Sequence, residues 1–272
     1  MYCNAACKKK HRHKHKKQCD RRVAELHDEK LFKEPPQQYE DCSICFMRMP
    51  SLQSGRRYKS CCGKLICSGC ELAPVYDDLG NVIANKICPF CRIPAPTSNE
   101  VAIERLYKRV EAGDDDAMNC LGLYYAQGTY GLTLDYTKAL ELWHNATELG
   151  HASAYHNIAC AYYGGRGVEI DKKKAKHYYE LAAMKKDSFA RNCVGSMEEQ
   201  AGNWTRAVKH HMIAAQSGEA DSVKHIQQLY SNGHATKDDY TAALQVYQQY
   251  LGEVKSVQRD KAAAASAQYR YY

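Results

Sequence analysis

From about residue 100 onward, apolar residues recur at the three- and four-residue spacing of amphipathic helices, and Gly-containing turns separate the helical segments. Four stretches of this region align with one another. Their corresponding alanines are Ala139, Ala175, Ala207 and Ala243, at intervals of 36, 32 and 36 residues. A period near 36 residues with two helices in each unit is typical of a helical solenoid.

One side of each unit is predicted to form the core. Apolar residues repeat at one position of the first helix, namely Leu121, Ile158, Val194 and Ile226. Rings repeat on the second helix, namely Trp143, Tyr179, His211 and Tyr247. We expect these stripes to be core packing and not a cofactor site. The segment 103–117 matches only the second-helix end of a unit and is expected to cap the array.

The stretches "LGLYYAQGTYG" and "AYYGGRGVEIDKKKAKHYYELAA" give the repeats a family resemblance. They resemble Sel-one-like repeats, relatives of the tetratricopeptide family, over residues 101–255. The resemblance implies a surface that holds a protein or peptide.

The chain before residue 97 has a different character. It contains all seven prolines and eleven of the fourteen cysteines, and it ends in "IPAPTS" at residues 93–98, which is expected to be a short connector. We therefore predict a mainly α protein, in which a small Cys-rich domain precedes the solenoid. The expected parts are 1–36, 37–98, 99–258 and a C-terminal tail, 259–272.

Charge and hydropathy exclude several classes of protein. The formal net charge is +7, but residues 8–22 alone hold nine Lys or Arg against one Asp, so the rest of the chain is close to neutral. The body is thus not a nucleic-acid-binding surface by charge. No window approaches the ~20 apolar residues of a membrane span, and the N-terminus lacks the apolar region of a secretion signal. We expect a cytoplasmic or nuclear protein.

Eight cysteines form four closely spaced pairs: Cys42 with Cys45, Cys61 with Cys62, Cys67 with Cys70, and Cys88 with Cys91. Zinc takes four sulfur or nitrogen ligands in a tetrahedron, and a C-x2-C turn supplies two of them. Eight thiolates therefore suffice for two zinc ions. A segment of this size has a marginal core, which bound zinc would stabilise.

The pairs resemble those of a RING finger over residues 40–95. In that family the first and third pairs bind one ion, which implies a site of Cys42, Cys45, Cys67 and Cys70. The second site would contain Cys62, Cys88 and Cys91, with Lys64 where the family usually has histidine. Lysine at neutral pH has no lone pair to give a metal, and no histidine lies between His27 and His144. Cys61 is the obvious replacement. The alternatives are one of the two adjacent cysteines with a carboxylate or water, or an empty second site.

The RING resemblance implies recruitment of a ubiquitin-conjugating enzyme without catalytic residues in the chain itself. Ile44 and Pro89 match the apolar contacts to that enzyme, and Arg92 matches the arginine that bridges it to ubiquitin. A planar guanidinium suits that bridging role because it spans two acceptors.

The N-terminal segment carries a second cysteine and histidine pattern. Its members are Cys3, Cys7, His15 and Cys19, which resemble the closing half of a MYND zinc finger. They would bind one further zinc ion. The basic run "KKKHRHKHKK" could instead be a nuclear import signal, a nucleic-acid tether or a solvated helix face.

The function predicted is that of a ubiquitin ligase, which recruits a conjugating enzyme through the zinc domain and a protein substrate through the repeats. The alternative is a non-enzymatic scaffold in which a degenerate RING mediates protein contacts only. A chromatin or transcription adaptor is a third, weaker option.

Overall fold

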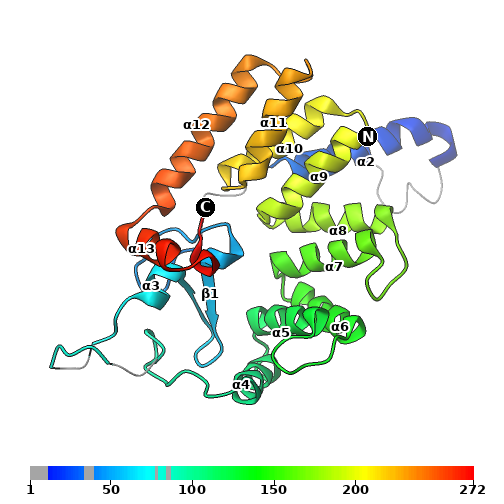
Figure 1. Ribbon diagram of the computed structural model, residues 1–272. Coiled ribbons are helices and arrows are strands. Elements are labelled where there is room, and N and C mark those ends of the chain that lie inside the picture. The colour runs from blue at the N-terminus through cyan, green and yellow to red at the C-terminus, as the bar shows by residue number, and fades with distance from the viewer. Residues whose placement is uncertain (1–11, 34–39, 77–78, 84–86) are drawn as a thin grey trace. The chain divides into compact units, whose positions relative to one another are not determined.

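The computed structural model describes residues 12–33, 40–76, 79–83 and 87–272 (Figure 1). The chain divides into two compact units, Met1–Gln37 and Gln38–Tyr272. In the first unit, α2 covers Arg12–Leu31 and includes part of the basic run. Ion pairs such as that between Arg21 and Glu25, four residues apart, support the exposed face of this helix.

The repeats of the second unit form consecutive helix pairs (Figure 1). α4 (Asn99–Glu111) comes first and packs on α5, where the sequence predicted a cap. The pairs are α5 (Asp115–Gln127) with α6 (Tyr136–Glu148), α7 (Ala152–Gly164) with α8 (Lys172–Met184), α9 (Ser188–Gln200) with α10 (Trp204–Gln216), and α11 (Ala220–Ser231) with α12 (Lys237–Val254).

Local chemistry sets the ends of these helices. Asp135 and Asp171 accept hydrogen bonds from the first backbone amides of α6 and α8, as N-cap residues do. Gly128 and Gly165 end α5 and α7 at φ values of 62° and 68°, which glycine adopts without strain. In the third unit α9 ends at Ala201, and the left-handed residue is Gly202, with a φ of 74°.

The predicted ridge is the core of the repeats. All four of its members are at most 1% exposed: Leu121, Ile158, Val194 and Ile226. The four corresponding alanines are fully buried. The ring stripe is buried at Trp143, Tyr179 and His211, but Tyr247 is only half-buried. Tyr250, one turn further along α12, takes the buried place because α12 also contacts the Cys-rich segment, where the Tyr250 hydroxyl accepts from the Ser51 amide.

The Cys-rich segment contains short elements. The 3-10 turn η1 (Gln53–Gly55) leads into an antiparallel hairpin of β1 (Arg56–Lys59) and β2 (Lys64–Cys67), which pairs Arg56 with Cys67 and Lys59 with Lys64. Helix α3 (Ser68–Leu72) follows directly. The buried apolar cluster here is small, and three of its five members are Cys42, Cys67 and Cys70.

The C-terminal residues expected to form a tail are ordered into α13 (Val257–Ala265) and η2 (Ala267–Tyr269). Helix α13 packs against α3 (Figure 1). A Cβ on Gly69 of α3 would lie 2.9 Å from the Arg259 backbone nitrogen, so the two helices approach closely. The Cys-rich segment and the end of the repeats thus share an interface within the second unit.

No helix among the described residues is long and apolar enough to cross a membrane.

Candidate metal centres

The first cysteine cluster joins the first and third pairs. The sulfurs of Cys42, Cys45, Cys67 and Cys70 all lie within 4.8 Å of one another. The Cys45 and Cys67 sulfurs are 3.9 Å apart. The Cys67 backbone amide donates to the Cys42 sulfur at 3.3 Å. The structure therefore brings the first and third pairs together, in the grouping that the RING resemblance implied.

The second cluster joins the other two pairs and includes both adjacent cysteines. Its members are Cys61, Cys62, Cys88 and Cys91, again within 4.8 Å of one another. The Cys61 and Cys91 sulfurs are 3.4 Å apart, and those of Cys62 and Cys88 are 4.0 Å apart. The tight turn between β1 and β2 makes this possible, because the amides of Cys62 and Gly63 both donate to the Lys59 carbonyl.

Lys64 lies outside this second cluster. Its side chain is exposed, and its ammonium nitrogen lies 5.8 Å from the centre of the Phe90 ring, a cation–π arrangement. Lys64, at the usual histidine position, therefore contributes nothing to the cluster. The fourth sulfur comes from the doubled cysteine, Cys61 and Cys62.

Two of the three C-x2-C segments, 42–45 and 88–91, have the same backbone turn, whereas the third, 67–70, lies at the start of α3. The amide of the residue after the second cysteine donates to the carbonyl of the first at 2.9 Å, from Phe46 to Cys42 and from Arg92 to Cys88. Phe46 and Arg92 both have positive φ, at 54° and 64°. Positive φ is uncommon outside glycine, and both turns share it at the same position, so they present their paired sulfurs in the same way.

The clusters have the dimensions of four-thiolate metal sites. Zinc–sulfur bonds of about 2.3 Å in a tetrahedron separate the sulfurs by about 3.8 Å, and the three separations above range from 3.4 to 4.0 Å. Without a cation the four thiols of a cluster resist joint ionisation: a hydrogen bond from Cys67 lowers the pKa of Cys42 to about 4, while burial raises the pKa of Cys70 to about 12. A bound dication would stabilise all four thiolates together.

Two arginines support the clusters from outside. Arg259 of α13 is fully buried, and its guanidinium lies 4.0 Å from the Cys45 sulfur. Arg109 of α4 donates to the Cys61 carbonyl at 3.3 Å and to the Ser60 carbonyl at 3.4 Å. The sequence does not reveal either arginine as a partner of the clusters, since neither belongs to a motif and each lies far along the chain from its cluster.

The residues expected to contact a conjugating enzyme lie on the two turns. Ile44 and Pro89 are half-exposed and Arg92 is exposed. Arg92 donates to the Tyr76 carbonyl at 2.7 Å. Their role in binding a partner stays a prediction.

Most of the N-terminal set lies outside the described residues: Cys3 and Cys7 are not described, nor is the side chain of His15. Cys19 is buried on α2, and its sulfur is disulfide-bonded. A zinc site of these four residues requires the reduced thiol, and it stays a prediction.

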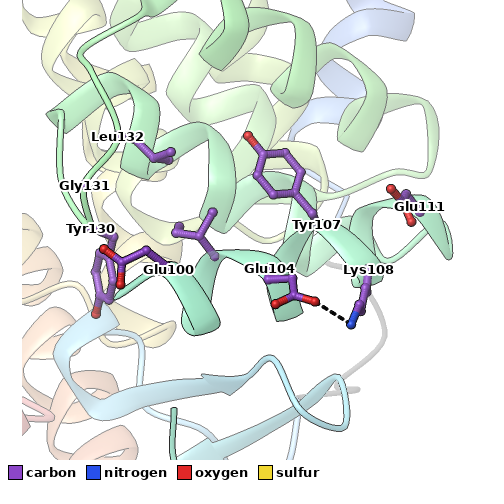
Figure 2. A pocket seen from close by; sticks show the side chains of 9 residues that line it. Glu100, Glu104, Tyr107, Lys108, Glu111, Tyr130, Gly131 and Leu132 are labelled. Atoms are coloured by element: carbon purple, nitrogen blue, oxygen red, sulfur yellow. Dashed lines mark ion pairs between the residues drawn. The ribbon is translucent and has the colours of Figure 1, made fainter. Parts of the chain in front are cut away.

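A surface pocket of about 440 Å³ lies on the first helices of the repeat region (Figure 2). Helix α4 contributes Glu100, Glu104, Tyr107, Lys108 and Glu111, and the loop after α5 contributes Tyr130, Gly131 and Leu132. The Lys108 ammonium forms an ion pair with Glu104 at 2.8 Å. The other two carboxylates of the pocket, Glu100 and Glu111, do not share this ion pair. The pocket combines exposed tyrosine rings with an excess of negative charge.

The repeats match a known family. The Sel1 repeat family model matches residues 115–151 and 152–187. The RING and MYND resemblances have no such family match and remain predictions.

Two solved structures are similar to part of the chain. A Sel1 repeat protein from Oxalobacter formigenes is 28% identical with a TM-score of 0.49, over 62% of this chain and 65% of that one. The protein c5321, a protective antigen of uropathogenic Escherichia coli strains displaying an SLR fold, is 26% identical with a TM-score of 0.49, over 60% of this chain and 35% of that one. The chain therefore spans less than two thirds of either protein.

No curated protein matches the chain. The prediction of Sel-one-like units is confirmed by the family model for the first two: residues 115–187 are two Sel1 repeats.

Proposed function

We propose that this protein is a two-zinc RING-type ubiquitin ligase, in which residues 40–95 dock a ubiquitin-conjugating enzyme and the repeats hold a protein substrate. The observation that carries the proposal is the pairing of the cysteines, first with third and second with fourth. With this alternation the two ion sites belong to one interleaved domain, whereas two independent zinc fingers would each use consecutive pairs. Zinc is the ion proposed because an all-thiolate tetrahedron suits it.

The surface of the two turns supports docking of a protein partner. Apolar side chains are exposed around the clusters: Phe46 is 78% exposed and Phe90 is 44% exposed. Ile44 lies two residues before Phe46, and Pro89 directly precedes Phe90, on the same two turns. An apolar surface rimmed by a cation, Arg92, is typical of a protein-binding site.

The Sel1 repeats support a protein-interaction role for the rest of the chain. The pocket on α4 is the part of the repeat region best suited to a charged segment of a partner (Figure 2). Its carboxylates and tyrosine rings favour a Lys or Arg side chain, which would gain both an ion pair and a cation–π contact.

The test is autoubiquitination by the full chain with a panel of conjugating enzymes. Ile44→Ala should reduce activity about tenfold, since truncating a contact of this size costs about 1.5 kcal/mol. Arg92→Ala should reduce it further without loss of zinc, because the arginine bridges the enzyme and ubiquitin in the family. Leu134→Ala and Lys237→Ala, at an exposed leucine and an exposed lysine of the repeats, are the matched controls.

Activity lost in both test variants, with zinc content unchanged, supports the ligase. No activity with any conjugating enzyme, in a protein that retains its zinc, overturns it in favour of a non-enzymatic scaffold.

A further inference from the structure

Three side chains from consecutive helices of the repeats converge on one point. Glu199 lies at the end of α9, His211 within α10 and His225 within α11. The Glu199 oxygen Oε1 lies 2.7 Å from Nε2 of His211 and 3.1 Å from Nδ1 of His225. Two imidazole nitrogens therefore face the same carboxylate oxygen.

The nitrogen of His211 that faces Glu199 carries a lone pair. The His211 side chain is fully buried, so its ring has no contact with solvent. Its Nδ1 lies 2.9 Å from the side-chain oxygen Oδ1 of Asn192, which can only accept a hydrogen bond. Nδ1 therefore carries a hydrogen, and in the neutral imidazole the lone pair is on Nε2, which faces Glu199 as a metal-binding nitrogen would.

His225 repeats this situation on the other side of the carboxylate. Its Nδ1 is buried and makes no hydrogen bond with the described residues, although the Glu199 oxygen Oε1 lies 3.1 Å away. Its ring stacks on that of His211, with the centroids 4.6 Å apart and the planes 3° apart. Polar atoms buried in this way are unfavourable unless a shared proton or a metal cation lies among them.

The repeat pattern makes His211 unusual. Trp143 and Tyr179 occupy the same position in the first two units, and each is buried there. Gly195 leaves room for the imidazole, as a Cβ there would lie 2.6 Å from its ring. Histidine replaces an apolar ring in the one unit whose neighbouring helices also supply Glu199 and His225, so the three polar residues occur together.

We propose that Glu199, His211 and His225 bind a divalent transition-metal ion, with zinc the best fit, at a site between α9, α10 and α11. Two imidazoles and a carboxylate form a common zinc ligand set that leaves a fourth position open to water or substrate. Asn192 is a positioning residue, which fixes the His211 tautomer as an outer partner of a metal-bound histidine does.

The site is accessible and nearly the right size. The side chains of Glu199 and His225 are 23% and 29% exposed, so an ion can reach them from solvent. Metal–ligand bonds of about 2.0–2.2 Å place tetrahedral ligands about 3.3 Å apart. On binding, the 2.7 and 3.1 Å separations would therefore widen by a few tenths of an ångström, and one of the two parallel rings would rotate so that both lone pairs, which lie in the ring planes, point at the ion.

The experiment is a zinc titration of the full chain by calorimetry, after a mild chelator has removed loosely held metal. Wild type should bind one equivalent more than His225→Gln or Glu199→Gln. Asn192→Ala should weaken that equivalent about 10- to 100-fold, as loss of an outer-shell partner does. Because the N-terminal segment is rich in Cys and His, the difference between wild type and variants is the readout, not the absolute count.

His177→Gln is the matched control, since this exposed histidine lies in the preceding repeat. Cobalt at the proposed site should add visible absorption without a sulfur-to-metal band. Equal equivalents in wild type and His225→Gln, with unchanged circular dichroism, would mean that these residues form only a hydrogen-bonded cluster. Loss of the same equivalent in His177→Gln would also overturn the proposal.

Discussion

The guanidinium of Arg259 lies 4.0 Å from the sulfur of Cys45, although the two residues are 214 positions apart in the chain. The same guanidinium donates to the carbonyl of Arg48 at 2.9 Å and to that of Val254 at 2.7 Å. Burial alone would lower the pKa of Arg259. The contacts of its guanidinium with Cys67 and Cys45 outweigh burial and raise that pKa. Arg259 therefore stays charged beside the first cysteine cluster and ties the end of the chain to it.

Replacement of Arg259 should destabilise the second unit and its first metal site together. Arg259→Met keeps most of the side-chain volume but leaves two buried carbonyls without a donor, at a cost of about 2–4 kcal/mol. It also removes a positive charge beside four thiolates. Thermal unfolding and the rate of zinc release to a chelator measure the two effects.

Lys261→Met is the control, because Lys261 is an exposed residue of the same helix. Equal stability and equal zinc release in the two variants would contradict a supporting role for Arg259.

Metal removal should loosen the C-terminal helices as well as residues 40–95. The division expected from the sequence, with a connector at residues 93–98, would confine the effect to the Cys-rich domain, but Arg259 and Tyr271 are fully buried at the interface with the Cys-rich segment. A Cβ on Gly55 would lie 2.8 Å from that of Tyr271, so the packing is close. Hydrogen exchange after chelation should rise in residues 40–95 and 256–272, with residues 115–187 still protected. Exchange confined to residues 40–95 would contradict this.

Two glycines of the repeats should respond to alanine in opposite directions. A Cβ on Gly122 would lie 2.4 Å from Nε1 of Trp143, so Gly122→Ala overpacks the core and should cost about 1–3 kcal/mol. Gly252 of α12 has open space around it, so Gly252→Ala should stabilise the helix by about 0.5–1 kcal/mol. Urea unfolding of both variants tests the packing; a neutral Gly122→Ala would show that α5 and α6 are further apart.

The cysteines of the repeats should differ in reactivity. The Cys160 sulfur lies 3.3 Å from Nε2 of His156, and although burial raises the pKa of Cys160, this contact lowers it overall. Burial raises the pKa of Cys120 and of Cys193 to about 12. Because a lowered pKa raises the fraction of thiolate at a given pH relative to the other two cysteines, Cys160 should be alkylated first at pH 7, and its rate should fall as the pH is lowered.

Peptide mass spectrometry of the alkylated protein measures each cysteine separately. His156→Gln should slow Cys160 at pH 7 and leave Cys193 unchanged. Equal rates at all three sites would show that access, and not the imidazole, governs the reaction.

The parts of the fold that follow local rules could be predicted from the sequence. Leu121 and Ile158 lie at equivalent places of one repeated pattern, and their burial follows from helical spacing. The C-x2-C spacing likewise indicated which two cysteines share a turn, because each turn is built from neighbouring residues, whereas the sharing of a site by two turns was implied only by the resemblance to RING fingers.

The contacts between distant segments could not be predicted. Arg259 lies in an Ala-rich helix with no motif, and only the folded chain brings it to Cys45. The burial of Tyr250 in place of Tyr247 could not be predicted for the same reason, because the Tyr250 hydroxyl contacts Ser51 in the distant Cys-rich segment. His211 was predicted to lie in the core and is buried there. Its polar neighbours could not be predicted, because the repeat pattern does not distinguish the helices of one unit from those of another.

The central claim is that both adjacent cysteines, Cys61 and Cys62, complete the second of two all-thiolate zinc sites. Cobalt substitution of the full chain tests it most directly, because the thiolate-to-cobalt absorption reports sulfur ligands and not the histidine site. Cys61→Ser should lower that absorption by between about one eighth and one half, as one or all four sulfurs of the site are lost. Cys120→Ser, at a cysteine of the repeats, should leave it unchanged. Equal absorption in the two variants would contradict the account.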